Sequence, residues 1–203
     1  MAGNAIRCVG KYLYDKRIVK KEYMTIETAG GIKSLLLYTR NGKANTISVG
    51  MGKADLDAMS LPTTLPGSTI INRPVEIAGG TYHITCASVG NPHCDPSALD
   101  LETLGPKFER ASYFPERINT EFVRIVNEDT LRMRVYERGN GETVACGTGA
   151  CAAVIAATEN GFVEKGKDIT VKLVGGDLVV KYTDLEVILT GDAVLVYEGV
   201  VEY

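Results

Sequence analysis

The sequence has no long hydrophobic run and no cluster of basic residues. Its longest apolar stretches, such as residues 34–38 and 152–157, fall far short of the roughly 20 residues that a membrane-spanning helix needs. The N-terminus shows no signal-peptide pattern. The net charge is only −3 and no Lys/Arg run marks one face, so neither nucleic acid nor a membrane surface is an expected partner. These absences predict a cytoplasmic protein.

A cysteine framework and a metal motif are also missing. The five cysteines are odd in number and irregularly spaced, unlike a secreted disulfide scaffold, so free thiols are expected. His83, Cys86, His93 and Cys94 lie within a dozen residues, but residues three apart on a strand point to opposite faces, so His83 and Cys86 are poorly placed to share an ion. No consensus for pyridoxal phosphate or nucleotides is visible. The sequence therefore predicts neither a metal nor an organic cofactor.

What is present is the patterning of an α+β protein. With 203 residues and 45% hydrophobic content, the chain is long enough for one large or two small domains. Helices are expected at residues 5–16, 99–108 and 150–158, with Pro106 weakening the second half of the middle one. Strands are expected at residues 22–29, 32–40, 44–51, 75–77, 82–89, 118–127, 130–137, 169–173, 178–182, 186–190 and 193–203. Residues 52–67 have turn composition and form the expected interdomain linker.

The segment from Glu137 to Ala153 carries the strongest chemical signal. Cys146-Gly147-Thr148-Gly149 precedes an Ala-rich helical stretch, so Cys146 is expected at a helix N-terminus. The next three backbone N–H groups have no intrahelical partner there and can hold an anion such as a carboxylate. The same helix dipole favours a thiolate, which predicts a lowered pKa for the Cys146 thiol. The alternative is a Gly-rich turn in which the cysteine packs as a small apolar residue.

A second small-residue helix start lies at the beginning of the chain. Residues 2–5 (AGNA) align with residues 146–149 (CGTG), and a helical pattern follows each. Two such starts indicate two pseudo-equivalent domains, each pointing a helix N-terminus into a shared cleft. The first start has Ala2 where the second has Cys146.

Five stretches occur in order along the chain: AGNAIRC at 2–8, GNPHC at 90–94, PERINTEF at 115–122, ERGNGET at 137–143 and ACGTGACAA at 145–153. Together they resemble the pyridoxal-phosphate-independent amino-acid racemases and epimerases, and within them the diaminopimelate epimerase family. The resemblance covers the whole chain. It implies an α+β fold of two pseudo-equivalent, barrel-like antiparallel β domains, each wrapped around a central helix.

The resemblance also implies a domain division. Residues 1–60 correspond to a partial first domain, residues 61–189 to the second domain, and residues 190–203 to a final strand that returns to the first domain. The family's first domain begins some tens of residues before the Gly-Asn motif, so the first domain is expected to be incomplete. A cut sequence and a natural truncated relative both remain open.

The chemistry implied by the resemblance is the interconversion of LL- and meso-diaminopimelate. One cysteine thiolate takes the α-proton and a second cysteine thiol delivers a proton to the opposite face, while the helix N-termini neutralise the substrate carboxylate. Cys146 matches the second cysteine, but Ala2 occupies the position of the first, so the chain is expected to be inactive or nearly so. The expected partner is a small amino-acid substrate, and a homodimer is left open.

The resemblance assigns substrate contacts to both halves of the chain. They are Gly3, Asn4, Asn91, Asn119, Glu137, Arg138, Gly147 and Thr148. It also implies that His93 and Glu137 modulate the ionisation of the cysteines. From the residues alone, Asn91 belongs to an Asn-Pro turn and Arg138 to an exposed salt bridge. Cys8 and Cys151 are expected to pack rather than to react.

Two other functions stay open. A proline or hydroxyproline racemase has the same fold, but its cysteine neighbourhood differs from the ERG and ACGTGAC pattern found here. A non-catalytic ligand-binding or interaction protein derived from the epimerase keeps the binding groups without proton transfer. Exchange of the substrate α-hydrogen with D₂O separates catalysis from binding alone.

Overall fold

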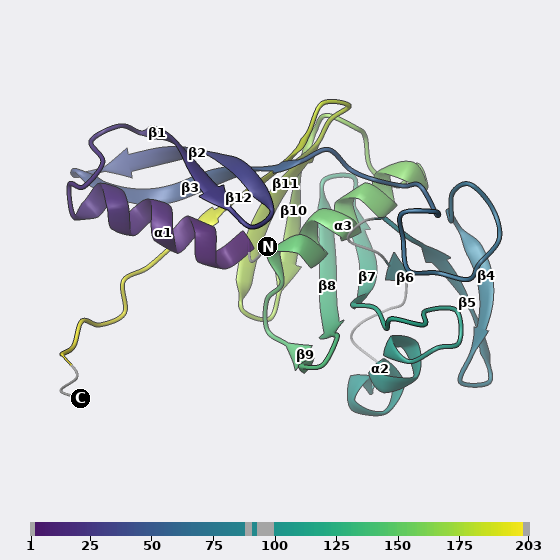
Figure 1. The fold of residues 1–203 in the computed structure, drawn as a ribbon. Helices are drawn as coiled ribbons and strands as arrows, with labels where there is room; N and C mark the ends of the chain where they lie inside the picture. The colour runs from purple at the N-terminus through teal and green to yellow at the C-terminus, as the bar shows by residue number, and fades with distance from the viewer. Residues whose placement is uncertain (1–2, 88–90, 93–99, 201–203) are drawn as a thin grey trace.

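The computed structural model of the chain describes residues 3–87, 91–92 and 100–200 (Figure 1). Its helices are α1 (Gly3–Asp15), α2 (Leu101–Glu109) and α3 (Gly147–Glu159). Its strands are β1 (Tyr23–Thr28), β2 (Gly31–Arg40), β3 (Lys43–Gly52), β4 (Arg73–Ile77), β5 (Gly80–Thr85), β6 (Asn91–Pro92), β7 (Thr120–Asn127), β8 (Thr130–Glu137), β9 (Gly141–Thr143), β10 (Asp168–Leu173), β11 (Gly176–Tyr182) and β12 (Val187–Asp192). The expected α+β class is confirmed. Among the described residues, no helix is long and apolar enough to cross a membrane.

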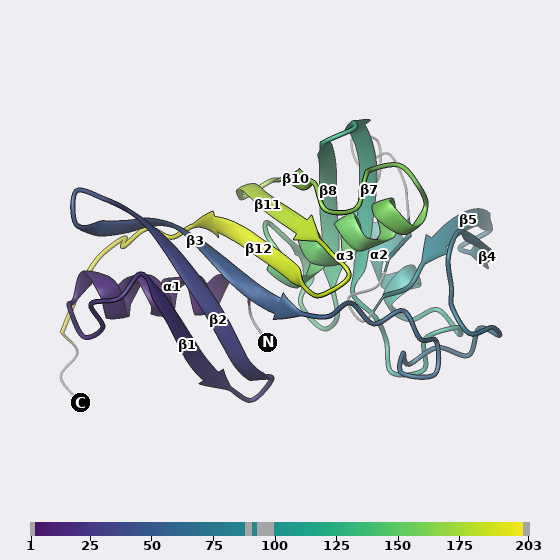
Figure 2. The ribbon, with the colours of Figure 1, turned by 90° about the horizontal axis from the view of Figure 1, so that it is seen from above.

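A nine-stranded sheet runs through the molecule. Its order is β1-β2-β3-β12-β11-β10-β8-β7, with β9 paired to β8. β12 pairs antiparallel with β3 on one side and with β11 on the other, so it joins strands from the two ends of the sequence. α1 lies along β1–β3, whereas β7, β8, β10 and β11 curl around α3 (Figures 1 and 2). A separate sheet of β4, β5 and β6 lies near α2.

Local sequence explains the main hairpins and the central helix. Asn41 and Gly42 have φ values of 52° and 73°, as a two-residue turn with both central residues in the left-handed region requires, and they join β2 to β3. α3 has ten buried residues out of 13, because its alanines let the strands approach on all sides. A helix that is apolar all round is a core helix.

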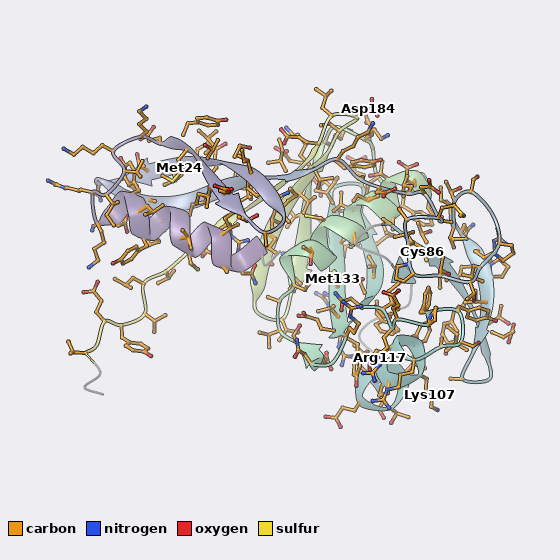
Figure 3. The ribbon with its side chains drawn as sticks, in the orientation of Figure 1. Met24, Cys86, Lys107, Arg117, Met133 and Asp184 are labelled. Carbon is orange, nitrogen blue, oxygen red and sulfur yellow. The ribbon has the colours of Figure 1, made fainter. Side chains whose placement is uncertain are left out.

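Three apolar clusters fill the fold. Figure 3 labels one member of each: Met24 between α1 and β1–β3, Met133 against α3, and Cys86 beside β5. The alternation predicted for residues 130–137 is confirmed in β8, where Leu131, Met133 and Val135 are fully buried towards α3. This packing fixes the position of the first turn of α3.

The strand predicted at residues 193–203 is wrong over its described part. Residues 193–200 form no strand, because none of the described strands pairs with them, and apolar residues there such as Val194 are exposed. The helix predicted at residues 99–108 is confirmed as α2, which continues through Pro106 to Glu109 although proline removes one helical hydrogen bond. The Asp100 carboxylate caps the start of α2 by accepting the Thr103 N–H at 3.3 Å, and Phe108 anchors its end in the core.

α1 is buried along one side. Ile6 and Gly10 face β2 and β3, and a Cβ at Gly10 would lie 2.6 Å from Leu35 Cδ2, so only glycine permits this approach. The opposite side of α1 is open, with Val9 and Tyr12 exposed to 44% and 54%. α1 is therefore covered less completely than α3.

Candidate functional site

The N-termini of α1 and α3 meet, as the paired small-residue starts predict. A Cβ built at Gly147 lies 3.4 Å from the Gly3 Cα and 3.3 Å from Asn4 Oδ1. A Cβ at either glycine comes within 2.9 Å of Leu189 Cδ2, from β12. Gly3, Asn4 and Gly147 thus gather at one point, where two positive helix ends face each other.

This junction has no room for another methyl group. Leu189 is fully buried and the Gly3 contact is to backbone, so neither neighbour of Gly147 can retreat easily. We expect Gly147→Ala to lower the free energy of unfolding by about 1–3 kcal/mol in denaturant titrations. Gly199→Ala is the matched control, because a Cβ there meets nothing within 4 Å. Equal stability of the two variants would show that the helices are not packed this closely.

Cys146 is the N-cap residue of α3. Its backbone is extended, with φ −131° and ψ 113°, and its Sγ accepts the Gly149 N–H at 3.3 Å. The Thr148 hydroxyl lies 3.4 Å from the same sulfur. Among the described residues, no hydrogen bond is made to the N–H groups of Gly147 and Thr148. Two amides at the end of the helix dipole therefore remain available for an anion.

The ionisation of Cys146 differs from the sequence prediction. Burial raises the pKa of the thiol above its usual value, and the carboxyl groups of Glu121 and Glu137 raise it further. The hydrogen bonds from Thr148 and Gly149 act in the opposite direction but do not prevail. The predicted lowering by the helix dipole is wrong because Cys146 is only 8% exposed, and burial disfavours the charged form. Cys146 is held here as a thiol, the form that donates a proton.

Asn4 is oriented by Arg7, one turn further along α1. Arg7 Nη2 donates to Asn4 Oδ1 at 3.1 Å, Nη1 donates to the Gly3 carbonyl at 3.3 Å, and Nε donates to the Asp192 carbonyl at 3.3 Å. With its oxygen engaged, the Asn4 amide keeps Nδ2 as a donor. Arg7 thereby fixes the start of α1 to the end of β12.

Asn119, Glu137 and Arg138 form a second group at the end of β8. The Asn119 side-chain oxygen accepts the Arg138 backbone N–H at 2.8 Å. The Arg138 guanidinium is exposed and donates to the Glu116 carbonyl at 3.1 Å. Glu137 accepts a hydrogen bond from the Thr143 hydroxyl, and its charge acts on Cys146. Glu137 therefore links this group to the helix junction.

Three of the predicted site residues cannot be placed. Ala2 and His93 lie outside the described residues, and for Asn91 only the backbone is described, in β6 paired with Thr85. Within the described part of the chain, no group of three or more His, Cys, Asp or Glu side chains is placed to hold a metal.

The other cysteines divide between burial and exposure. Cys151 is buried, and burial raises the pKa of its thiol to about 12, in agreement with a packing role. Cys8 is exposed, so the prediction that it packs like Cys151 is wrong. Cys8 is on the side of α1 opposite the cluster with Leu35, where it lines a hollow between α1 and residues 193–195.

Hollows of the described surface that lie apart from this junction include two of several hundred Å³. One of about 420 Å³ is lined by residues of β2, β3, β11 and β12, and another of about 340 Å³ lies between α1 and residues 193–195. Neither is lined by a predicted site residue. Gly3, Asn4, Cys146 and Gly147 thus gather at the helix junction and not at either hollow.

Three residues near the helix junction were not predicted from the sequence: Arg7, Glu121 and Leu189. Arg7 and Glu121 lie inside quoted motifs, AGNAIRC and PERINTEF. Glu121 carried a signal that was not used: it shares a strand face with Val123, so it is an acid at a position that alternation assigns to the core. Leu189 gave no signal, because its contact with two glycines exists only in three dimensions.

Comparison with solved structures supports the fold. A hydroxyproline epimerase from Agrobacterium vitis, solved with trans-4-hydroxy-L-proline, matches with a TM-score of 0.67 and 15% identity over 95% of this chain and 63% of its own. A probable proline racemase from Agrobacterium radiobacter matches with a TM-score of 0.69 and 15% identity over 95% of this chain and 65% of its own. At this level of identity the likeness concerns the fold alone.

Sequence comparison places the chain in a family. Residues 85–196 match the diaminopimelate epimerase family. The diaminopimelate epimerase of Acetivibrio thermocellus is 45% identical over 100% of this chain and 74% of its own length. That of Methanococcus maripaludis strain C5 is 42% identical over 100% of this chain and 75% of its own length. The chain therefore belongs to the diaminopimelate epimerase family, a family of isomerases.

Proposed function

We propose that the helix junction binds the amino-acid end of diaminopimelate and that Cys146 is its proton-transfer group. The observation that supports this most directly is the position of Cys146 at the N-terminus of α3, beside two N–H groups that have no partner among the described residues. The substrate carboxylate would accept from Gly147 and Thr148, with Asn4 Nδ2 as a further donor. Negative charge that builds up beside the carboxylate is then stabilised.

In this proposal, the remaining predicted residues lie around the helix junction and either contact the substrate or modulate the ionisation of Cys146. Glu137 modulates the thiol, while Asn91, Asn119 and Arg138 contact the substrate beyond its reacting carbon, and His93 adjusts ionisation of the cysteine. Residues 1–60 and 61–189 form the two halves, and residues 190–203 return to the first. No cofactor takes part, because the proton-transfer group is a side chain of the protein.

In this proposal, the chain has a proton-transfer group on only one face of the reacting carbon. Inversion needs a base on one face and an acid on the other, and alanine at position 2 has no ionisable group. The proposed activity is therefore exchange of the α-hydrogen from the Cys146 side alone. The small ionised fraction of Cys146 takes the α-proton, the thiol that results exchanges its proton with D₂O, and the sulfur returns a deuteron to the same face, with little or no inversion. A binding protein derived from the epimerase is the second candidate, favoured by the same alanine.

Exchange in D₂O tests this proposal. We expect slow incorporation of deuterium at the α-carbon of one stereoisomer, LL or meso, followed by NMR, with its configuration retained. Cys146→Ala should reduce exchange to the background rate, whereas Cys8→Ala should leave it unchanged, since Cys8 lies on the open side of α1. Substrate binding with no exchange above background would instead establish the binding protein.

A further inference from the structure

A buried carboxyl group lies under the first turn of α3, next to the proposed proton-transfer group. Glu121, on β7, is fully buried. Its Oε1 lies 2.6 Å from the Cβ position of Gly149, and its Cγ and Cδ lie at 3.1 and 3.2 Å from the same point. Gly149 is also the residue whose N–H donates to Cys146 Sγ at 3.3 Å. The carboxyl and the sulfur therefore share one glycine as neighbour.

The strand geometry aims Glu121 at this place. Along β7, Thr120 and Phe122 point to one face, and Phe122 joins the cluster with Phe108, 5.2 Å from its ring. Glu121 and Val123 point to the other face, and Val123 packs in the cluster that contains α3. An acid thus replaces an apolar side chain at a core position directly below the helix N-terminus. Only glycine at position 149 leaves room for it.

We propose that Glu121 is a positioning residue for Cys146, and that the Glu121 carboxyl group controls whether the Cys146 sulfur carries a proton. This inference rests on the proposed function of Cys146 and extends it. A helix N-terminus favours one negative charge near its first amides. Because the carboxyl and the thiol compete for that stabilisation, ionisation of one opposes ionisation of the other. Glu121 thereby keeps Cys146 as a proton donor.

The direction of the electrostatic effects agrees with this competition. The Glu121 charge raises the pKa of the Cys146 thiol, and burial raises the pKa of Glu121 itself well above its ordinary value of 4.5. Among the charged groups on the packed elements, Glu137 of β8 acts on both groups in the same direction. Cys151 is the other titratable group on the buried face of α3, and Arg7 of α1 acts on it.

The other charged side chains near β7 are directed elsewhere. On α2, the Glu109 carboxylate accepts the Gly139 N–H at 3.0 Å and approaches Arg117 at 3.6 Å. On β8, Arg134 pairs with Glu142, and Arg132 is exposed on the same side of the strand. His93, which follows β6, lies outside the described residues. Among the described residues, Glu121 and Glu137 are thus the carboxyl groups that act on the Cys146 sulfur.

Thiol labelling tests the inference without requiring catalysis. The rate at which iodoacetamide alkylates Cys146 is measured against pH, with the Cys146 peptide resolved by mass spectrometry from the other cysteines. In Glu121→Gln we expect the midpoint of the curve of alkylation rate against pH to fall by about one pH unit. At a pH below this midpoint, Cys146 should then be alkylated about tenfold faster than in the unchanged protein. Glu121→Asp shortens the acidic side chain by one methylene group and should lower the midpoint of the labelling curve by a smaller amount.

Glu109→Gln is the matched control. It also removes a carboxyl group that is only 3% exposed, but one that does not act on Cys146. An unchanged midpoint in folded Glu121→Gln and Glu121→Asp, or an equal shift in Glu109→Gln, would overturn the inference. A shifted midpoint without any α-hydrogen exchange would refute the proposed function and leave the coupling of the two groups intact.

The pH dependence of stability separates coupling from a purely structural role. Because the pKa of Glu121 is raised, the folded state holds a proton that the unfolded state releases above about pH 4.5. The contribution of this group is therefore fully present below that pH and is lost as the pH rises towards its folded-state pKa. In denaturant titrations at several pH values, we expect the free energy of unfolding of Glu121→Gln to fall less with rising pH. Glu109→Gln should keep the full decrease.

Discussion

Ala2→Cys is expected to raise the rate at which LL-diaminopimelate is converted to the meso form by at least about 100-fold. A positioned acid or base contributes roughly 10²–10⁴-fold to proton transfer. In the two-cysteine scheme implied by the family resemblance, Cys146 is the proposed proton-transfer group, and alanine occupies position 2, where the scheme expects the other cysteine. Restoring the missing thiol would supply the second face of the reacting carbon.

The helix junction explains why one substitution is expected to suffice. Residue 2 directly precedes Gly3, just as Cys146 directly precedes Gly147. These two glycines pack against the same Leu189 methyl group, and a Cβ on Gly3 would lie 3.5 Å from the Gly147 Cα. A cysteine at position 2 is therefore one residue away from the contact between the helices, as Cys146 is.

Stereochemistry provides the measurement. Circular dichroism or chiral chromatography follows inversion, and NMR in D₂O follows exchange in the same samples. Ala2→Ser is the control for size, because a hydroxyl adds volume without a thiol's acidity, and Ala2→Cys with Cys146→Ala should again exchange without inverting. If Ala2→Cys gains no inversion while Cys146 still supports exchange, a thiol at position 2 does not act on the second face of the reacting carbon, and the assignment of that position is refuted.

The secondary structure followed from local patterns where these patterns were strong. The period-two alternation in residues 130–137 and the Asn41-Gly42 turn gave β8 and the β2–β3 hairpin correctly, because side-chain direction and turn conformation depend on adjacent residues. The strand predicted at residues 193–203 is not found in residues 193–200, although their apolar composition is suitable. A strand also needs a hydrogen-bonded neighbour, and sequence composition does not reveal one.

The site could be predicted only in part for a related reason. The position of Cys146 as the N-cap of α3 was readable from the glycines that follow it and the alanines beyond. The direction of its pKa shift was not readable, because it depends on burial and on carboxyl groups that β7 and β8 bring close. The role of Arg7 could not be predicted from the sequence either, since one of its acceptors, the Asp192 carbonyl, is 185 residues away along the chain.

Arg7→Met is expected to destabilise the protein by about 2–4 kcal/mol and to weaken substrate binding. The guanidinium is 6% exposed and donates to three oxygens, on Gly3, Asn4 and Asp192. Methionine preserves much of the side-chain volume but leaves these acceptors without their donor. The guanidinium also packs closely on β12, since a Cβ at Gly191 would lie 3.1 Å from Arg7 Cζ.

The loss of binding should have a distinct cause from the loss of stability. Asn4, released from Arg7, can turn its oxygen towards the substrate carboxylate and repel it, so we expect a higher Kd for diaminopimelate in calorimetry even at temperatures where the variant is fully folded. Arg132→Met, which removes an exposed arginine from β8, should change stability by no more than about 0.5 kcal/mol and leave Kd unchanged. An Arg7→Met protein with reduced stability but normal affinity would confine Arg7 to a structural role. A loss of both stability and substrate affinity would show that the buried guanidinium holds the N-terminus of α1 in the conformation that binds the substrate. Because Arg7 is on α1 and bonds to β12 as well, this conformation depends on more than the helix itself.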